Sequence, residues 1–224
     1  MFIDIAQNRL SSTVEPGELD GLPALKEVHF EGNQLMGPLP DFRDSVNVTV
    51  IDLSNNSFSG SFPSAWLFLS LVKELNLGHN KLILRGKNSF ASLRGMGGLE
   101  QFRVPNNRVS NMPHGVGELV AQLPPKHLKV IDLSSNHLEG SFEGGWLSRN
   151  LALQQLSVKN NSITSFPVDL LFTGVKVVDF SANKLTAIQL TELQQSTLLQ
   201  GKLVLTDNPQ LLGELPYFAR YSDE

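Results

Sequence analysis

The residue types that catalyse reactions or bind metals occur in this 224-residue sequence, but their spacing forms no site. The sequence has no cysteine, which excludes disulfides, thiolate metal ligands and cysteine nucleophiles. The five histidines show neither the HExxH pattern nor another metal-ligand spacing; they are His29, His79, His114, His127 and His137. We therefore expect no metal, no cofactor and no catalytic residue, and we do not expect this chain to be an enzyme.

Two glycine-containing stretches imitate nucleotide-binding loops without completing them. "GKNS" (86–89) looks like the end of a phosphate-binding loop, but Lys81 stands where the first glycine is needed. "GMGGLE" (95–100) begins like a dinucleotide turn, but it ends in Glu100 and no strand immediately precedes it. Both stretches are predicted to be ordinary connecting loops.

Charge and hydropathy exclude two further classes of partner. The formal net charge is −4, so no overall field attracts nucleic acid or an anionic membrane. The longest apolar run, at 65–72, is far too short to span a bilayer, and no basic region followed by a long apolar run opens the sequence. We expect no nucleic-acid partner and no membrane contact in this segment, although a longer protein containing it could be anchored to a membrane.

Aspartates recur in similar stretches of the sequence and reveal an internal repeat. "VIDLSNNSFSGSFPSAW" (50–66) and "VIDLSSNHLEGSFEGGW" (130–146) are nearly the same sequence, which indicates an internal repeat. The repeat is marked by asparagines that lie 22 to 29 residues apart, each after an apolar-x-apolar pair. These asparagines are Asn8, Asn33, Asn56, Asn80, Asn107, Asn136, Asn161, Asn183 and Asn208. The aspartates recur because the repeat does, and we interpret them as a solvated column.

The pattern has a direct physical interpretation. Alternating apolar residues over five positions predict a short strand with one buried face. One such strand cannot bury that face alone, whereas stacked units form a parallel sheet over a continuous core. The asparagine lies where each coil leaves its strand, and its amide can satisfy backbone groups that the sheet leaves unpaired. The nine asparagines are therefore predicted to form a structural ladder.

These units read LxxLxLxxNxL, which resembles the leucine-rich repeat over nearly the whole chain. Stretches such as "GPLP" (37–40) and "GSFP" (60–63) are similar to the plant-type subclass. The resemblance implies an α/β repeat solenoid: a right-handed superhelix with a parallel β-sheet on the concave face and an irregular or short-helical convex side. Units four, five and eight depart from the plant-type form, and unit eight is predicted to carry a short helix with Ile188, Leu190 and Leu193 on its apolar side.

The extent of the array is a separate expectation. Residues 1–224 are predicted to form one leucine-rich repeat domain of about nine repeats, with the first repeat truncated. The motif's opening leucine would precede Met1, and the capping segments usual for such arrays are not visible. We expect a fragment of a longer protein or a truncated gene model.

Partner binding is expected on the exposed positions of the strands, because the concave face is the usual binding face of a solenoid. Aromatic anchors are absent from the row between each apolar pair and from the row just after it. Varied polar residues gather instead over units two to five, and we predict a partner-binding cluster there. It comprises His29, Glu31, Asn76, His79 and Arg103.

A second candidate is a basic segment within residues 81–108. It has six cations against the single acid Glu100, and the sequence predicts a protruding loop that carries Arg85, Lys87 and Arg94 toward an acidic partner. A solvated connecting loop is the alternative. Trp66 and Trp146 are expected to pack beneath the convex layer.

By resemblance, plant-type leucine-rich repeats supply receptor ectodomains and secreted inhibitors. We predict a non-catalytic recognition module for a protein, peptide or carbohydrate partner, part of a receptor-like, glycosylated signalling protein outside the cell or at its surface. The three glycosylation sequons, at Asn47, Asn55 and Asn160, support secretion only weakly, since chance alone predicts about two. The alternatives are a cytoplasmic protein-interaction scaffold, the ligand-binding part of a receptor kinase, and, least favoured, an ice- or mineral-binding surface.

Overall fold

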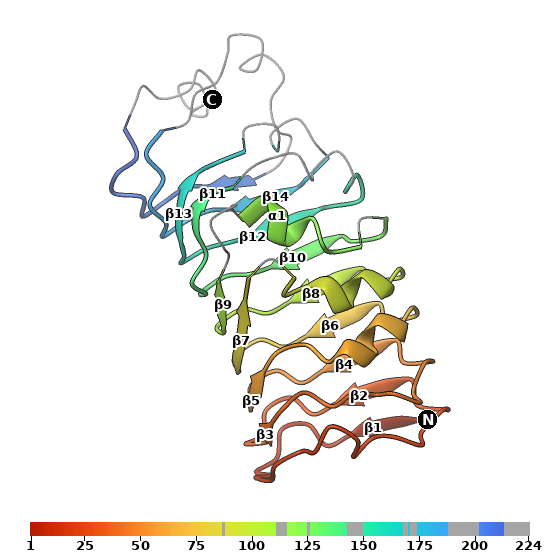
Figure 1. The fold of residues 1–224 in the computed structure, drawn as a ribbon. Helices are drawn as coiled ribbons and strands as arrows, with labels where there is room; N and C mark the ends of the chain where they lie inside the picture. The colour runs from red at the N-terminus through yellow and green to blue at the C-terminus, as the bar shows by residue number, and fades with distance from the viewer. Residues whose placement is uncertain are drawn as a thin grey trace.

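Short parallel strands, one per coil, form the main sheet of the molecule (Figure 1). The structure is a computed structural model that describes residues 1–86, 88–110, 116–124, 126–142, 150–167, 170, 174–187 and 202–212. The sheet has nine strands in the order β1-β2-β4-β6-β8-β10-β12-β14-β15. Their bounds are β1 Phe2–Asp4, β2 Glu27–His29, β4 Val50–Asp52, β6 Glu74–Asn76, β8 Gln101–Arg103, β10 Val130–Asp132, β12 Gln155–Ser157, β14 Val177–Asp179 and β15 Lys202–Val204.

Neighbouring strands pair in the register that the repeat predicts. Ile51 of β4 lies opposite Val28 of β2 on one side and Leu75 of β6 on the other, and all three side chains are buried. Each coil thus adds one apolar layer to a core that no single coil could form. The predicted repeat solenoid with a parallel sheet is confirmed.

A second set of strands runs along the flank of the array, and the sequence pattern did not predict it. Here β3 (Met36–Gly37), β5 (Ser57–Gly60), β7 (Lys81–Arg85) and β9 (Arg108–Ser110) form a four-stranded parallel sheet, while β11 (Glu139–Ser141) pairs with β13 (Ser162–Ser165). We call the four-stranded sheet the flank sheet and the nine-stranded one the concave sheet. Segments of two to five residues interrupted by glycine give too short an alternation to be recognised as strands.

The expected protruding loop at 81–108 is instead a regular coil. Its first five residues form β7, in which Leu82 and Leu84 are buried between exposed neighbours. A 3₁₀ helix, η2 (Ala91–Gly95), follows and buries Leu93. Burial of these leucines holds the segment against the core, so its described residues do not form a loop that projects into solvent.

Short helical turns cover the opposite side of the array from the flank sheet (Figure 1). They are η1 (Ser64–Phe68), η2 and the helix α1 (Val116–Val120). Gly95 is required where η2 packs on η1, because a Cβ there would lie 1.7 Å from the carbonyl oxygen of Leu67. The predicted helix around residues 188–193 lies outside the described residues.

Trp66 belongs to η1, and its side chain packs into the core beneath the convex layer, as expected. Its side chain is fully buried, its ring stacks on Phe62 with centroids 5.6 Å apart, and its Nε1 donates to the Pro40 carbonyl at 2.9 Å. A buried indole needs such an acceptor, so this bond fixes the ring between two coils. Trp146 lies outside the described residues.

The asparagines connect the two sheets. Asn80 Nδ2 donates to the carbonyl of Leu77 in its own coil and to that of Leu53 in the preceding coil, at 3.1 and 2.9 Å. Its Oδ1 accepts from the N–H of Phe58, a residue of β5, at 2.9 Å. Equivalent bonds recur from Asn33 to Asn208, whereas Asn8 bonds only the carbonyls of Ile5 and Ala6 in its own coil. Each asparagine thus satisfies backbone groups at the point where a coil turns from one sheet to the next.

The residue before each asparagine adopts a left-handed backbone. Its φ lies between 52° and 71° in all nine coils, and only Gly32 among them is a glycine. The others are Gln7, Asn55, His79, Asn106, Ser135, Asn160, Ala182 and Asp207. Left-handed backbone is strained for most residues other than glycine. The hydrogen bonds of the asparagine that follows this residue must therefore stabilise the turn.

Candidate functional site

The concave sheet presents its outward side chains in columns that cross the coils. Strand pairing aligns His29 with Asp4 and Asp52, and it aligns Arg103 with Asn76 and Asp132. Adjacent strands lie about 4.8 Å apart, so these side chains touch or nearly touch across coils. The residues of the predicted partner-binding cluster lie on one face, where their contacts divide them into three small groups.

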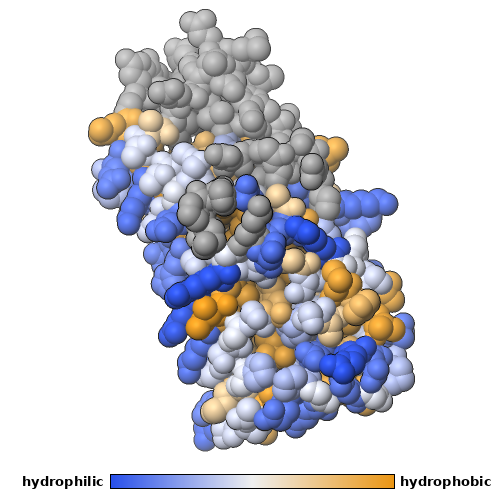
Figure 2. Space-filling model, in the orientation of Figure 1, coloured by the Kyte–Doolittle hydropathy of each residue, from blue (hydrophilic) through white to orange (hydrophobic). Residues whose placement is uncertain are grey.

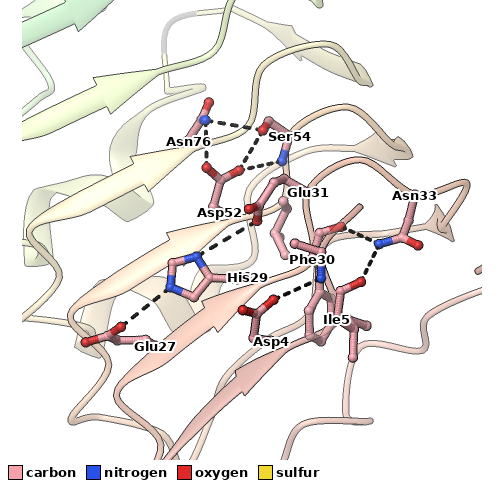
Figure 3. Close-up of polar contacts among 12 residues, drawn as sticks. Asp4, Ile5, Glu27, His29, Phe30, Glu31, Asn33, Asp52, Ser54 and Asn76 are labelled. Carbon is pink, nitrogen blue, oxygen red and sulfur yellow. Dashed lines mark hydrogen bonds and ion pairs between the residues drawn. The ribbon is translucent and has the colours of Figure 1, made fainter. Parts of the chain in front are cut away.

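The first group is centred on His29 of β2 (Figure 3). Its Nε2 lies 3.5 Å from Glu27 and its Nδ1 lies 3.9 Å from Glu31, and the imidazole is 31% exposed. One oxygen of Glu31 is shielded from solvent and accepts no hydrogen bond within the described part of the chain. The histidine thus lies between two carboxylates on a face that remains open to a partner.

The second group joins Asp52, Ser54 and Asn76 across two coils (Figure 3). Asp52 accepts from the backbone N–H and the hydroxyl of Ser54 at 3.0 and 2.6 Å, and Asn76 donates to it at 2.9 Å. Asn76 Oδ1 also accepts from the N–H of Gly78 at 3.2 Å. The predicted partner-binding residue Asn76 is therefore already occupied by internal bonds.

The recurring aspartates are more than a solvated column. Like Asp52, three others accept a hydrogen bond from the backbone N–H two residues later and so hold the chain at the end of the strand. These are Asp4, Asp132 and Asp179. A structural role explains why the same residue type recurs at this position.

The third group contains His79 and Arg103. His79 is exposed, and its Nε2 lies 3.3 Å from the amide nitrogen of Asn106 in the next coil. The guanidinium of Arg103 makes no ion pair or hydrogen bond with another described residue and is part-exposed. Arg103 is thus the member of the predicted cluster whose charge is most available to a partner.

Sequence reasoning missed the outward column that precedes each apolar pair. Glu27 of β2 and Glu74 of β6 lie in that column, so these two strands carry an outward acid, as β1 and β4 do with Asp4 and Asp52. No lysine or arginine occupies an outward position on these four strands. Arg103 on β8 is the first such cation along the face. Strand alternation was the available signal, since the residue before the pair must point the same way as the residue between it.

The predicted basic residues do not form one group. Arg85 is the last residue of β7 on the flank sheet, while Arg94 lies in the last turn of η2 on the other side of the array. Lys87 lies outside the described residues. The space-filling view shows strongly hydrophilic side chains beside a small hydrophobic area at the level of β7 and β9 (Figure 2).

One ion pair next to the concave sheet changes the titration of its acid. Lys129 Nζ lies 2.5 Å from a carboxylate oxygen of Glu100, and this hydrogen bond lowers the pKa of Glu100 below its usual value. The positive charges of Lys129, Lys73 and His127 act in the same direction, and desolvation opposes them. The two residues directly precede β8 and β10, so the pair links adjacent coils.

The described part of the chain carries no cluster suited to a metal ion and no helix suited to a membrane. No group of three or more histidines, aspartates and glutamates there is arranged to hold a metal ion. The helices among the described residues are too short or too polar to cross a membrane.

Comparison with known proteins places these observations in a family. The Leucine Rich Repeat family model matches residues 47–69 and 127–148, the two units that contain the near-identical stretches. Receptor-like protein 1 of Arabidopsis thaliana is 30% identical over 190 residues, which cover 81% of this chain and 16% of that protein.

Solved structures agree with the fold. The ectodomain of the Arabidopsis thaliana receptor kinase GASSHO1/SCHENGEN3, in complex with CASPARIAN STRIP INTEGRITY FACTOR 2, superposes with a TM-score of 0.78 at 22% identity, covering 96% of this chain and 25% of that one. The plant peptide hormone receptor RGFR1, in complex with RGF2, gives a TM-score of 0.69 at 25% identity, covering 83% and 28%. This chain therefore spans less than a third of each relative. By its repeats, its asparagine ladder and these matches, the chain belongs to the leucine-rich repeat proteins, in the plant-type subclass.

Proposed function

We propose that this chain is the ligand-recognition part of a receptor-like protein and that it binds a peptide or protein partner on the concave sheet without catalysing a reaction. The observation that carries the proposal is the change of side-chain charge along this sheet. Each of the strands β1, β2, β4 and β6 carries one outward acid and no outward cation, and the unpaired Arg103 follows on β8. A constant scaffold with variable outward residues suits recognition, because side chains can change without altering the coil.

The relatives support the same proposal. One relative is named a receptor-like protein, and the two superposed receptor structures were solved in complex with CASPARIAN STRIP INTEGRITY FACTOR 2 and with RGF2. By analogy the partner of this chain is an extended peptide or a protein segment, and the site acts outside the cell or at its surface. The exposed Asn55 and Asn160 of the sequons are compatible with a glycoprotein.

Charge complementarity specifies the partner further. A cationic group of the ligand would lie over the carboxylates of Glu27, Glu31 and Asp52, and an acidic or polar group would lie near Arg103. The imidazoles of His29 and His79 are part-exposed and exposed on the same face.

The proposal is tested by selecting peptides from a displayed random library on the immobilised chain and measuring their affinities by calorimetry. Arg103→Glu is expected to weaken the selected peptides by about tenfold or more, since it replaces an available cation with an acid. His79→Glu tests the neighbouring position. Lys184→Glu is the matched control, because Lys184 is exposed and lies beyond the concave strands. Selected peptides that bind both concave variants as tightly as the unmodified chain would refute the proposed site.

A further inference from the structure

The flank sheet carries a charged surface that the concave sheet does not share. In β7 the side chains of Lys81, Ile83 and Arg85 are exposed and alternate with the buried Leu82 and Leu84. Alternation in a strand directs every second side chain to the same face, so the three exposed residues point outward together.

Strand pairing extends this surface onto β9. Ile83 lies opposite Arg108, and Arg85 lies opposite Ser110. On the other edge of β7, Lys81 lies opposite Ser59 of β5. Three cations therefore surround one exposed isoleucine, and we call Lys81, Ile83, Arg85 and Arg108 the flank cation patch.

The cations of the flank cation patch have no internal partner. Among the described residues, Lys81, Arg85 and Arg108 make no ion pair and no side-chain hydrogen bond. The other exposed or half-exposed positions of β5 and β9 hold serines and a glycine, so none of the three strands presents an acid. In a chain of net charge −4, this is a local positive field that is not neutralised by its neighbours.

The isoleucine at the centre identifies the type of partner. Ile83 is 41% exposed, and contact with an apolar side chain would remove that surface from water. Arginine pairs with a carboxylate through two parallel hydrogen bonds, which favours aspartate or glutamate opposite Arg85. Lys81 attracts a second acid at the other end of β7, and Arg108 adds positive charge beside Ile83. A polyanionic carbohydrate would satisfy the cations but would leave Ile83 without an apolar partner.

We propose that the flank cation patch is a second docking surface, which binds an extended acidic protein segment with an apolar residue between its acids. The exposed positions of β7 lie about 6.6 Å apart, which is the spacing of alternate residues in any extended chain. A segment of the form acid-x-apolar-x-acid would therefore place its side chains over Arg85, Ile83 and Lys81 in turn. The surface is separate from the concave sheet, so this segment and the recognised ligand could be bound at the same time.

The test uses two capped synthetic peptides, one with the core Glu-Ser-Leu-Ser-Glu and one with the core Glu-Ser-Ser-Ser-Glu. Binding to the chain is measured by fluorescence anisotropy at low and at moderate salt. The leucine peptide is expected to bind more tightly than the serine peptide, and added salt should weaken both. Arg85→Glu and Arg108→Glu should each weaken the leucine peptide by about tenfold, and Ile83→Ser should remove its advantage over the serine peptide.

The matched control is Arg94→Glu, which makes the same change of charge at an exposed arginine on the other side of the array. Circular dichroism and thermal unfolding of each variant check that the fold is retained, and the milder Arg85→Ala replaces any variant that is not folded. Three results would each overturn the proposal: no binding of the leucine peptide, equal weakening by Arg94→Glu, or equal affinity for the two peptides. Polygalacturonate serves as the carbohydrate probe, and tight binding that Ile83→Ser leaves unchanged would assign the patch to a polyanion instead.

Discussion

The concave sheet and the flank sheet are made by the same coils, yet they differ in whether their polar side chains are bonded to other residues of the chain. On the concave sheet, Asp52, Ser54 and Asn76 bond one another across coils, and His29 lies between two carboxylates. On the flank sheet, the cations of the flank cation patch have no partner among the described residues. Much of the polar surface of the usual binding face therefore serves the scaffold, while unpaired charge is concentrated on the flank.

The first and largest expected effect tests which side of β7 faces the core. Leu84 is 1% exposed, and Leu84→Ala should lower the free energy of unfolding by about 2–5 kcal/mol through lost burial and a cavity. Its neighbour Ile83 is 41% exposed, and Ile83→Ala should cost less than about 1 kcal/mol. Urea denaturation of both variants measures the difference. If Ile83→Ala were the more damaging change, the outward face of the flank sheet would be wrongly assigned.

The second prediction concerns the ladder that connects the sheets. Asn80→Ala removes one acceptor oxygen and an amide NH2 group, leaving the Phe58 N–H and the carbonyls of Leu53 and Leu77 without this partner. Buried backbone groups without partners are costly, so the variant should lose about 2–4 kcal/mol in urea denaturation.

Asn8→Ala is the matched control for the ladder. Asn8 is exposed, and its amide bonds only two carbonyls of its own coil, so its loss should cost less than about 1 kcal/mol. Similar costs for the two variants would mean that the bonds between coils contribute little to stability.

The third prediction concerns how much the hydrogen bonds between polar side chains of the concave sheet contribute to the stability of the fold. Asp52 accepts hydrogen bonds from Ser54 and Asn76, whereas Asp179 accepts only from the N–H of Ser181 within the described residues. Asp52→Ala should therefore destabilise the chain by about 1–2 kcal/mol more than Asp179→Ala, as measured by urea denaturation. Equal costs would show that the bonds across coils are exchanged for water without loss.

The sequence predicted what depends on the repeat itself. Alternation in stretches such as residues 50–53 and the recurring asparagines were enough to predict the concave sheet and the outward columns between and just after the apolar pairs, but not the column before them. The left-handed residue before each asparagine could not be recognised, because Gly32 is the only glycine among the nine. The turn is imposed there by bonds from neighbouring coils, which overcome the local preference of residues such as Gln7 and Ala182.

The flank cation patch could not be assembled from the sequence for a similar reason. Charge counting grouped Arg85 with Arg94, which are near in sequence but lie on different sides of a coil. Register brings Arg108 next to Ile83, 25 residues away along the chain. Such contacts depend on the register between strands of adjacent coils, which cannot be predicted from a local stretch of sequence.

The fourth and smallest effect is expected at the ion pair of Glu100 and Lys129. The pKa of Glu100 is lowered in the folded chain, so the unfolded chain binds the proton more readily. The stabilisation by the pair is therefore complete above the pKa of the unfolded state, about 4.5. That contribution should decline as the pH falls below this value and through the folded pKa.

Because Lys129 is 45% exposed and Glu100 is 31% exposed, solvent screens the pair and limits its value to about 1 kcal/mol or less. Thermal unfolding of Glu100→Gln at neutral pH should show a small loss that shrinks toward zero in acid, with Glu118→Gln as the exposed-acid control. A loss that grew as the pH fell would have the opposite sign to the one expected from a lowered pKa. It would mean that the carboxylate of Glu100 is destabilised by its surroundings, and that adjacent coils of the concave sheet are joined by backbone pairing and apolar burial without help from this pair.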